Sequence, residues 1–162
     1  MMKISTYSYE EFLQKVKDFH GNIAPGIIAG GIMVDIAKDN LPAGEFFDVI
    51  CETGHCLPDA VQLLTPCTIG NRWLKIVDTG RYALTFYNKY TGEGIRVYLD
   101  AEKLGDWPSI RFWFLKEKPK NEQNLEDILD EFRRAGKEIY SMKKVKVKPS
   151  YVTSPEKKRS SV

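Results

Sequence analysis

The chain has 162 residues, 43% of them apolar, and carries 24 basic and 22 acidic side chains for a net charge of +2. This length suits one globular domain with its own core, and the balanced charge disfavours a general nucleic-acid binder, which needs a strongly basic surface. The three cysteines, odd in number, do not fit the disulfide framework of a small secreted protein. With no signal peptide and no uninterrupted apolar span, we expect a cytoplasmic protein that is not inserted in a membrane.

The first segment predicts a helix that begins after residue 8 and ends before residue 21. Ser8 is suited to cap it, and Glu10 and Glu11 fall in its first turn. The apolar positions recur with helical spacing and define one face: Phe12, Leu13, Val16 and Phe19.

A second helix is predicted from Pro25 to about Lys38, since proline is well tolerated in the first turn. Gly26 and Gly30 lie four residues apart on one face of this helix. An interior glycine costs about 1 kcal/mol relative to alanine. We therefore expect another segment to pack unusually close to this face.

Strands and two further helices are predicted after residue 45. Pro58 begins a short helix that ends before Pro66, and Asn124 caps a final long helix whose apolar positions continue to Ile139. Two helices precede the sheet and three strands come in succession, which predicts an α+β fold with a mixed, largely antiparallel sheet and a long C-terminal helix. The domain is expected to occupy residues 1–148, and a basic, disordered tail residues 149–162. The predicted strands are 46–51, 73–77, 83–88, 94–99 and a shorter one at 112–115.

Both histidines and all three cysteines lie between residues 20 and 67. Imidazole and thiolate are ligands that zinc prefers, and the adjacent His55 and Cys56 are easily placed around one ion together with His20. His20 is equally compatible with a simple interaction at the end of its helix. Cys56 precedes a helix, whose positive end is expected to lower the thiol pKa.

The other two cysteines are more ambiguous as ligands. Cys67 follows the helix that Cys56 precedes, and two cysteines at opposite ends of a straight helix cannot share a zinc ion with bonds of about 2.3 Å. Cys67 thus stays open between a ligand and a small buried residue, whereas Cys51 is expected in the core. Asp59 and Gln62 are expected on a solvated face.

Three motifs together resemble the FmdE family, which takes its name from formylmethanofuran dehydrogenase. The first is FHGNIAPG, which is similar to the FHGHLCPG-type opening of that family. The second is ETGHCLPDAVQLLTPCTIGN, and the third is KIVDTGRYALTFYN. The resemblance implies an α-β-α-β-β-β core, a homodimer, a metal-binding cleft and an association with operons for molybdenum or tungsten formylmethanofuran dehydrogenase.

Within these motifs, the family's functional positions match His20, Cys56, Gln62 and Cys67. Asn22 and Ala24 stand where the family has a second histidine and a cysteine, so an imidazole and a thiol are missing from the expected cleft. His55 is an additional histidine that partly compensates. The C-terminal zinc ribbon that many members carry is not expected here, because no cysteine follows Cys67.

Two hypotheses result. In the first, the chain is an FmdE-like metal-binding protein, an accessory or enzyme-like component linked to formylmethanofuran dehydrogenase or related one-carbon redox metabolism. A divalent metal, zinc by preference, would be held by residues drawn from His20, His55, Cys56 and Cys67. In the second, the chain is a non-catalytic dimeric module that has lost part of the metal site and binds a small ligand or a partner protein. The aromatic segment WPSIRFWFL, or the last helix, is expected at the dimer interface.

Overall fold

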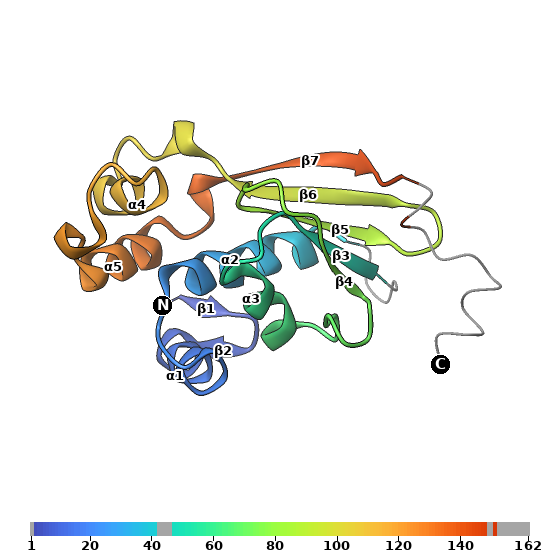
Figure 1. The fold of residues 1–162 in the computed structure, drawn as a ribbon, viewed down its shortest axis with the longest axis horizontal. Coiled ribbons are helices and arrows are strands. Elements are labelled where there is room, and N and C mark those ends of the chain that lie inside the picture. Colours follow the sequence, from blue (N-terminus) through green and yellow to red (C-terminus); the bar gives the residue numbers. More distant parts are fainter. Residues whose placement is uncertain (1, 42–46, 149–150, 152–162) are drawn as a thin grey trace.

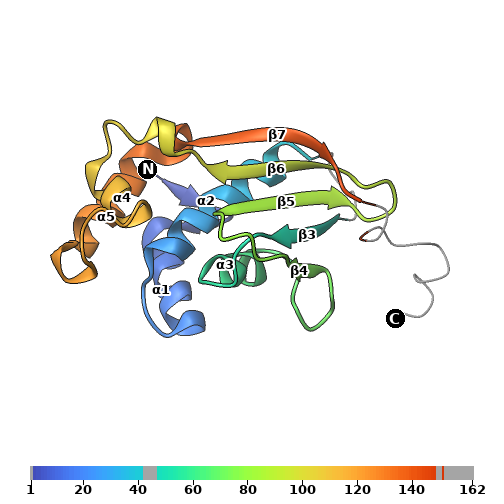
Figure 2. The same cartoon turned by 45° about the horizontal axis from the view of Figure 1, so that its top comes forward.

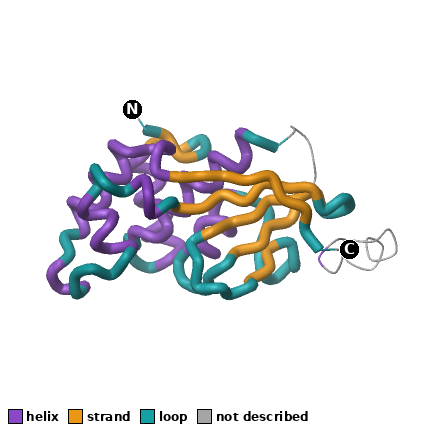
Figure 3. The backbone as a smooth tube through the Cα atoms, turned by 90° about the horizontal axis from the view of Figure 1, so that it is seen from above, coloured by secondary structure: helices purple, strands orange, loops and turns teal. Residues whose placement is uncertain are grey.

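The computed structural model describes residues 2–41, 47–148 and 151. A five-stranded sheet carries helices on one of its faces, and the last two α-helices extend beyond one end of the strands (Figures 1 and 2). Seen from above, the helices gather toward that end and the strands run side by side toward the other (Figure 3). The N-terminal half supplies the helical layer, and the C-terminal half supplies most of the sheet.

A short hairpin, β1 (Lys3–Ile4) and β2 (Tyr7–Ser8), leads into α1 (Tyr9–His20). Ser8 caps α1 as predicted: its Oγ accepts the Glu11 N–H, and the Glu11 carboxylate accepts the Ser8 N–H. Gly21 ends the helix in a left-handed conformation with φ of 96°. Phe19, expected on the apolar face, is instead 51% exposed.

The second helix, α2 (Pro25–Asp39), is the centre of the core. It lies between the sheet and α3 (Leu57–Leu64), and most of its residues are buried. A Cβ atom at Gly30 would lie 2.7 Å from Leu57 Cδ1 and 2.8 Å from Ala60 Cβ. The expected close approach at the glycine face is thus confirmed, and the neighbour is the first turn of α3.

The sheet has the strand order β4-β3-β5-β6-β7. Only β3 and β4 run parallel among these described strands, with α3 as the crossover between them, and the remaining neighbours are antiparallel. This confirms the predicted α+β class and the mixed, largely antiparallel sheet. The strands are β3 (Phe47–Cys51), β4 (Leu74–Ile76), β5 (Ala83–Asn88), β6 (Glu93–Leu99) and β7 (Tyr140–Lys146).

The strand predicted at 112–115 is wrong, because this segment belongs to a helix, α4 (Pro108–Phe114). Pro108 occupies its first turn, and the N–H of Ile110 donates to the buried carboxylate of Glu131 at 3.0 Å. The Trp113 ring packs edge-on against Phe132, with 5.8 Å between ring centroids. These contacts with a distant helix outweigh the strand preference of aromatic residues.

The C-terminal helix is shorter than predicted. It is α5 (Leu125–Ala135), capped by Asn124, and it ends at Gly136, whose φ of 57° and ψ of −128° suit glycine alone. A 3-10 turn, Gly136–Ile139, then leads into β7, which the sequence did not indicate. Part of the basic stretch beyond residue 142 therefore forms the edge strand of the sheet, where lysines discourage edge-to-edge pairing. The tail predicted at 149–162 lies outside the described residues except for Tyr151.

In the described part of the chain, no single helix is long and apolar enough to cross a membrane. The pair α1 and α2 meets that test of length and composition only when the two are taken together, and they are bent by 119° at the break between them.

Candidate metal and ligand site

The end of α1 and the beginning of α3 bring His20, Cys56 and Asp59 together. His20 is the last residue of α1, Cys56 directly precedes α3, and Asp59 lies in the first turn of α3. Cys56 Sγ lies 3.7 Å from His20 Nε2. The other ring nitrogen, His20 Nδ1, lies 2.6 Å from Asp59 Oδ2. The imidazole is therefore held between a thiol and a carboxylate.

The backbone at Cys56 is bent sharply, with φ of 59° and ψ of −50°. The N–H of Leu57 donates to the His55 carbonyl at 2.6 Å, which closes a three-residue γ-turn around Cys56. Such a conformation is strained for a residue other than glycine, and strained positions are concentrated at functional sites. The first turn of α2 packs against this turn, where a Cβ atom at Gly26 would lie 2.9 Å from Cys56 Cβ.

Asp59 is fixed by a second layer of hydrogen bonds. Gln62 Nε2 donates to Asp59 Oδ1 at 3.1 Å, and Gln62 Oε1 accepts the N–H of Ile69 at 3.1 Å. The expectation that Asp59 and Gln62 lie on a solvated face overlooks these contacts. Their spacing of three and six residues from Cys56, on the helix that Cys56 begins, is the signal that could have identified them.

Burial raises the pKa of the Cys56 thiol, and the nearby Asp59 carboxylate raises it further, while the Lys120 ammonium lowers it. The expectation of a lowered thiol pKa is therefore wrong. The position before a helix is outweighed by the loss of solvent and by a negative charge. Without a bound cation the thiol is the favoured form at neutral pH.

The distances fit a chelating pair. Bonds of about 2.3 Å to sulfur and 2.0–2.1 Å to nitrogen, at a tetrahedral angle, place the two donor atoms about 3.6 Å apart. The observed 3.7 Å between Cys56 Sγ and His20 Nε2 matches this spacing. A histidine that binds zinc through one nitrogen commonly donates the other N–H to a carboxylate, which is the position of Asp59.

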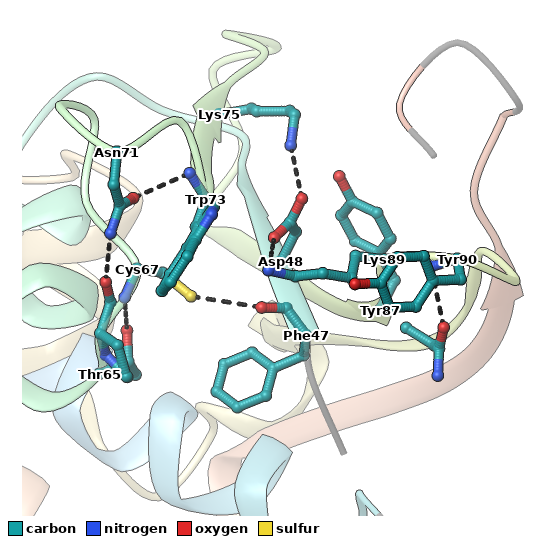
Figure 4. A network of polar contacts seen from close by, with 12 residues as sticks. Phe47, Asp48, Thr65, Cys67, Asn71, Trp73, Lys75, Tyr87, Lys89 and Tyr90 are labelled. Atoms are coloured by element: carbon teal, nitrogen blue, oxygen red, sulfur yellow. Dashed lines mark hydrogen bonds and ion pairs between the residues drawn. The ribbon is translucent and has the colours of Figure 1, made fainter. Parts of the chain in front are cut away.

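His55 and Cys67 are placed differently from these residues. The His55 side chain is exposed, on the outer side of the γ-turn. Cys67 is 1% exposed and lies beyond the far end of α3, a helix about 12 Å long. The Cys67 thiol donates to the Phe47 carbonyl at 3.6 Å, beside a buried ion cluster around Asp48 (Figure 4). Among the residues that are described, no three His, Cys, Asp or Glu side chains form a group that could hold a metal.

Cys51 occupies the core, as predicted. It is 0% exposed, donates to the Thr53 carbonyl at 3.1 Å, and has a pKa raised by burial to about 12. Burial likewise raises the pKa of Cys67 to about 11. Both thiols are inert at neutral pH, which distinguishes them from the half-buried Cys56.

A cavity of about 820 Å³ opens beside Cys56. Its walls come from the start of α2, from α4, from the segment that joins α4 to α5, and from the first turn of α5. Sequence reasoning missed this cavity because it treated the α4 segment as a strand. The residues that line it are Asn22, Ile23, Ala24, Pro25, Cys56, Trp113, Lys116, Glu117, Lys118, Pro119, Lys120, Gln123, Leu125 and Ile128.

Comparison with known proteins places the chain among relatives of the same kind. It is 51% identical to an FmdE-like protein of tungsten formylmethanofuran dehydrogenase from Syntrophus aciditrophicus, with a TM-score of 0.85 over 95% of this chain and 82% of that one. It is also 37% identical over 113 residues to a "Probable S-adenosyl-L-methionine-binding protein" of Archaeoglobus fulgidus, which corresponds to 65% of this chain. The chain spans only 29% of that relative's length.

The family model described as "FmdE, Molybdenum formylmethanofuran dehydrogenase operon" matches residues 19–148. This range contains the His20, Cys56 and Asp59 cluster, the cavity and the whole five-stranded sheet. The chain therefore belongs to the FmdE family.

Proposed function

We propose that this chain is a metal-binding member of the family, and that His20 Nε2 and Cys56 Sγ hold a divalent ion, zinc by preference. The observation that carries the proposal is the 3.7 Å separation of these two atoms, with Asp59 at 2.6 Å from the other ring nitrogen. A soft thiolate and an imidazole are donors that zinc selects. Asp59 would orient the ring and make its free nitrogen a better donor.

Two protein donors would leave further positions on the ion for water, for a bound small molecule, or for His55 after rotation of its side chain. The Cys56 side of the site faces the cavity, so a molecule in the cavity would reach those positions. An ion of this kind supplies Lewis-acid polarisation or an activated water. Cys67 takes no part in this proposal, because its thiol is already hydrogen bonded at the far end of α3.

We place this activity beside a molybdenum or tungsten formylmethanofuran dehydrogenase, in the cytoplasm, as an accessory or enzyme-like component. The description of the family and that of the Syntrophus protein support this link. Ligand exchange at an ion with open positions is chemistry that either role would use.

Metal content per chain tests the proposal. Protein without a histidine tag, exposed to zinc and then desalted, should retain close to one ion per chain by elemental analysis. Cys56→Ala and His20→Ala should each lose most of it. Cys51→Ala and Cys67→Ala are matched controls, since both thiols are buried and hydrogen bonded elsewhere. Wild-type protein that retains no metal at neutral pH would overturn the proposal, as would equal loss in a folded Cys51→Ala variant.

The second candidate is a binding module without metal. The raised pKa of Cys56 favours it, because a protonated thiol can hydrogen bond to His20 at 3.7 Å without any ion. In that case the cavity alone would carry the function. Metal retention by wild-type protein and loss in Cys56→Ala would exclude this alternative.

A further inference from the structure

We infer that the cavity beside Cys56 binds a small organic anion, a carboxylate or phosphate attached to an apolar body, whose acidic group is surrounded by Lys116, Lys118 and Lys120. This deepens the proposed function, and rests on it in one respect: it names the class of ligand that would meet an ion held by Cys56 and His20. The lysines and the apolar wall exist independently of that ion.

The charge of the cavity wall is the first step of the argument. Three lysines and a single carboxylate, that of Glu117, line the cavity. Glu117 is already neutralised, because its Oε1 accepts a hydrogen bond from Arg111 Nε at 3.1 Å. The wall therefore presents an excess of positive charge over a short stretch of chain, and a cation would be repelled from it.

This charge reaches the floor of the cavity. The Lys120 ammonium is close enough to lower the pKa of the Cys56 thiol, in opposition to burial and Asp59. Ala24, which begins α2, also lines the cavity and provides no side-chain cap for the fifteen-residue helix. The positive end of that helix adds to the field of the lysines.

The opposite part of the wall is apolar. Ile23, Trp113 and Ile128 line it, and Ile128 is 2% exposed. The Trp113 ring is held in place by its edge-on contact with Phe132. A volume of about 820 Å³ lies within the usual range of small-molecule sites, so the ligand has room for an apolar body as well as an acidic head.

The polar groups between these two parts are fixed by the backbone. Gln123 Nε2 donates to the Lys118 carbonyl at 2.8 Å, which closes the loop that carries the lysines. The Glu117 N–H donates to the Phe112 carbonyl at 3.1 Å, so the same loop is tied to the last turn of α4. The lysine backbone is therefore positioned before a ligand arrives, which reduces the entropy lost on binding.

Calorimetric titration with three matched probes tests the inference: 4-phenylbutanoate, 4-phenylbutanol and 4-phenylbutylamine. These share an apolar body and differ in the charge of the head. At low ionic strength, metal-free wild-type protein should bind the acid at least about tenfold more tightly than the alcohol and should not bind the amine. The preference should weaken as salt is added. Binding of the amine as strong as that of the acid would overturn the inference.

Variants locate the interaction. The triple change Lys116→Gln, Lys118→Gln and Lys120→Gln should lower affinity for the acid by about tenfold or more. A control triple with the same change in net charge is Lys15→Gln, Lys17→Gln and Lys38→Gln, whose exposed side chains do not line the cavity. Equal loss in the two triples would show a general charge effect and refute the assignment.

Repeating the titration with zinc-loaded protein separates this inference from the proposed function. Lysine-dependent binding in protein that holds no zinc would leave the inference standing and the metal proposal refuted. Binding that requires zinc and ignores the lysines would do the reverse. S-adenosylmethionine, a sulfonium cation, serves as a fourth probe. If it binds more tightly than the acid and independently of the lysines, the anion assignment is wrong.

Discussion

His20 Nε2 lies 3.7 Å from Cys56 Sγ, although the two residues are 36 positions apart in the sequence. Their meeting depends on two local structures, the end of α1 at a left-handed Gly21 and the γ-turn that precedes α3. The close packing of α2 on α3 holds these structures in register. The pair is therefore a product of the helical layer and does not require the sheet.

Asp59 should control the metal affinity of this pair. Asp59→Asn removes the carboxylate that orients the His20 ring, and we expect zinc to bind about 10–100-fold more weakly. The change also removes a charge that raises the Cys56 pKa, which reduces proton competition and partly offsets the loss at pH 7. The loss should consequently be larger at pH 9. Competition with a chromophoric chelator measures it, and Asp106→Asn, an exposed carboxylate, is the control. Unchanged affinity at both pH values would contradict this role.

Gly30 should tolerate no side chain. A methyl group there would lie within 2.8 Å of both Leu57 Cδ1 and Ala60 Cβ, so α2 and α3 would have to separate. We expect Gly30→Ala to lower the free energy of unfolding by about 1–3 kcal/mol, and Gly30→Leu by more. Urea denaturation measures the difference. Gly105→Ala is the matched control, because an added Cβ meets nothing within 4 Å there. Equal effects at the two glycines would refute the packing argument.

The sequence predicted the helical layer and most of the sheet because these elements carry local signals. Ser8 with Glu11, Pro25 and Asn124 each mark a helix start by hydrogen-bonding capacity or fixed φ. The α4 segment has strand-forming aromatics, and the buried Glu131 that receives its Ile110 N–H is 21 residues away. Strand β7 is rich in lysine, and it exists because β6 offers an open edge. Neither fact is visible within a local window.

The candidate site was predictable only in part. The shared cluster of His and Cys pointed to His20 and Cys56, whose proximity the structure provides. Asp59 was missed because a carboxylate on a helix is usually solvated, and its partner His20 lies 39 positions away. The cavity combines α2, α4 and α5, and its shape depends on a helix that the sequence did not indicate.

The buried ion cluster on the sheet should matter for stability. Asp48 is 2% exposed, and its carboxylate lies 2.9 Å from Lys75 Nζ and 3.4 Å from Lys89 Nζ (Figure 4). Asp48→Asn would leave two ammonium groups facing each other without the negative charge, at a cost of about 3 kcal/mol. Chemical denaturation tests this. Asp130→Asn, which removes an exposed carboxylate from Arg133 and Arg134, should leave stability nearly unchanged.

The homodimer stays a prediction, and the structure now provides a variant to test it. Leu115 follows α4, within the aromatic segment expected at the interface, and is 44% exposed. We expect sedimentation equilibrium to give about twice the chain mass of 18.6 kDa. Leu115→Lys should shift the protein toward the monomer, since a charge would be buried between the chains. Met142→Lys, at a residue 50% exposed on β7, should not. A monomeric wild type would refute the interface.

The buried thiols should make the fold sensitive to alkali. The pKa of Cys51 is raised to about 12 and that of Cys67 to about 11, whereas an unfolded chain has ordinary thiols that ionise near pH 9. Between these values the native state binds more protons than the unfolded state. The free energy of unfolding must therefore fall as pH rises, by about 1.4 kcal/mol per pH unit for each thiol.

Removing one thiol should remove its share of that slope. Urea denaturation of Cys51→Ala from pH 9 to pH 11 should show a fall in stability that is shallower than in wild type by about one proton, or about 1.4 kcal/mol per pH unit. Val49→Ala is the matched control, because Val49 is a fully buried neighbour on the same strand and has no titratable group. It should lower stability at every pH without changing the slope. Parallel slopes in wild type and Cys51→Ala would show that this thiol ionises as readily in the folded protein as in the unfolded chain.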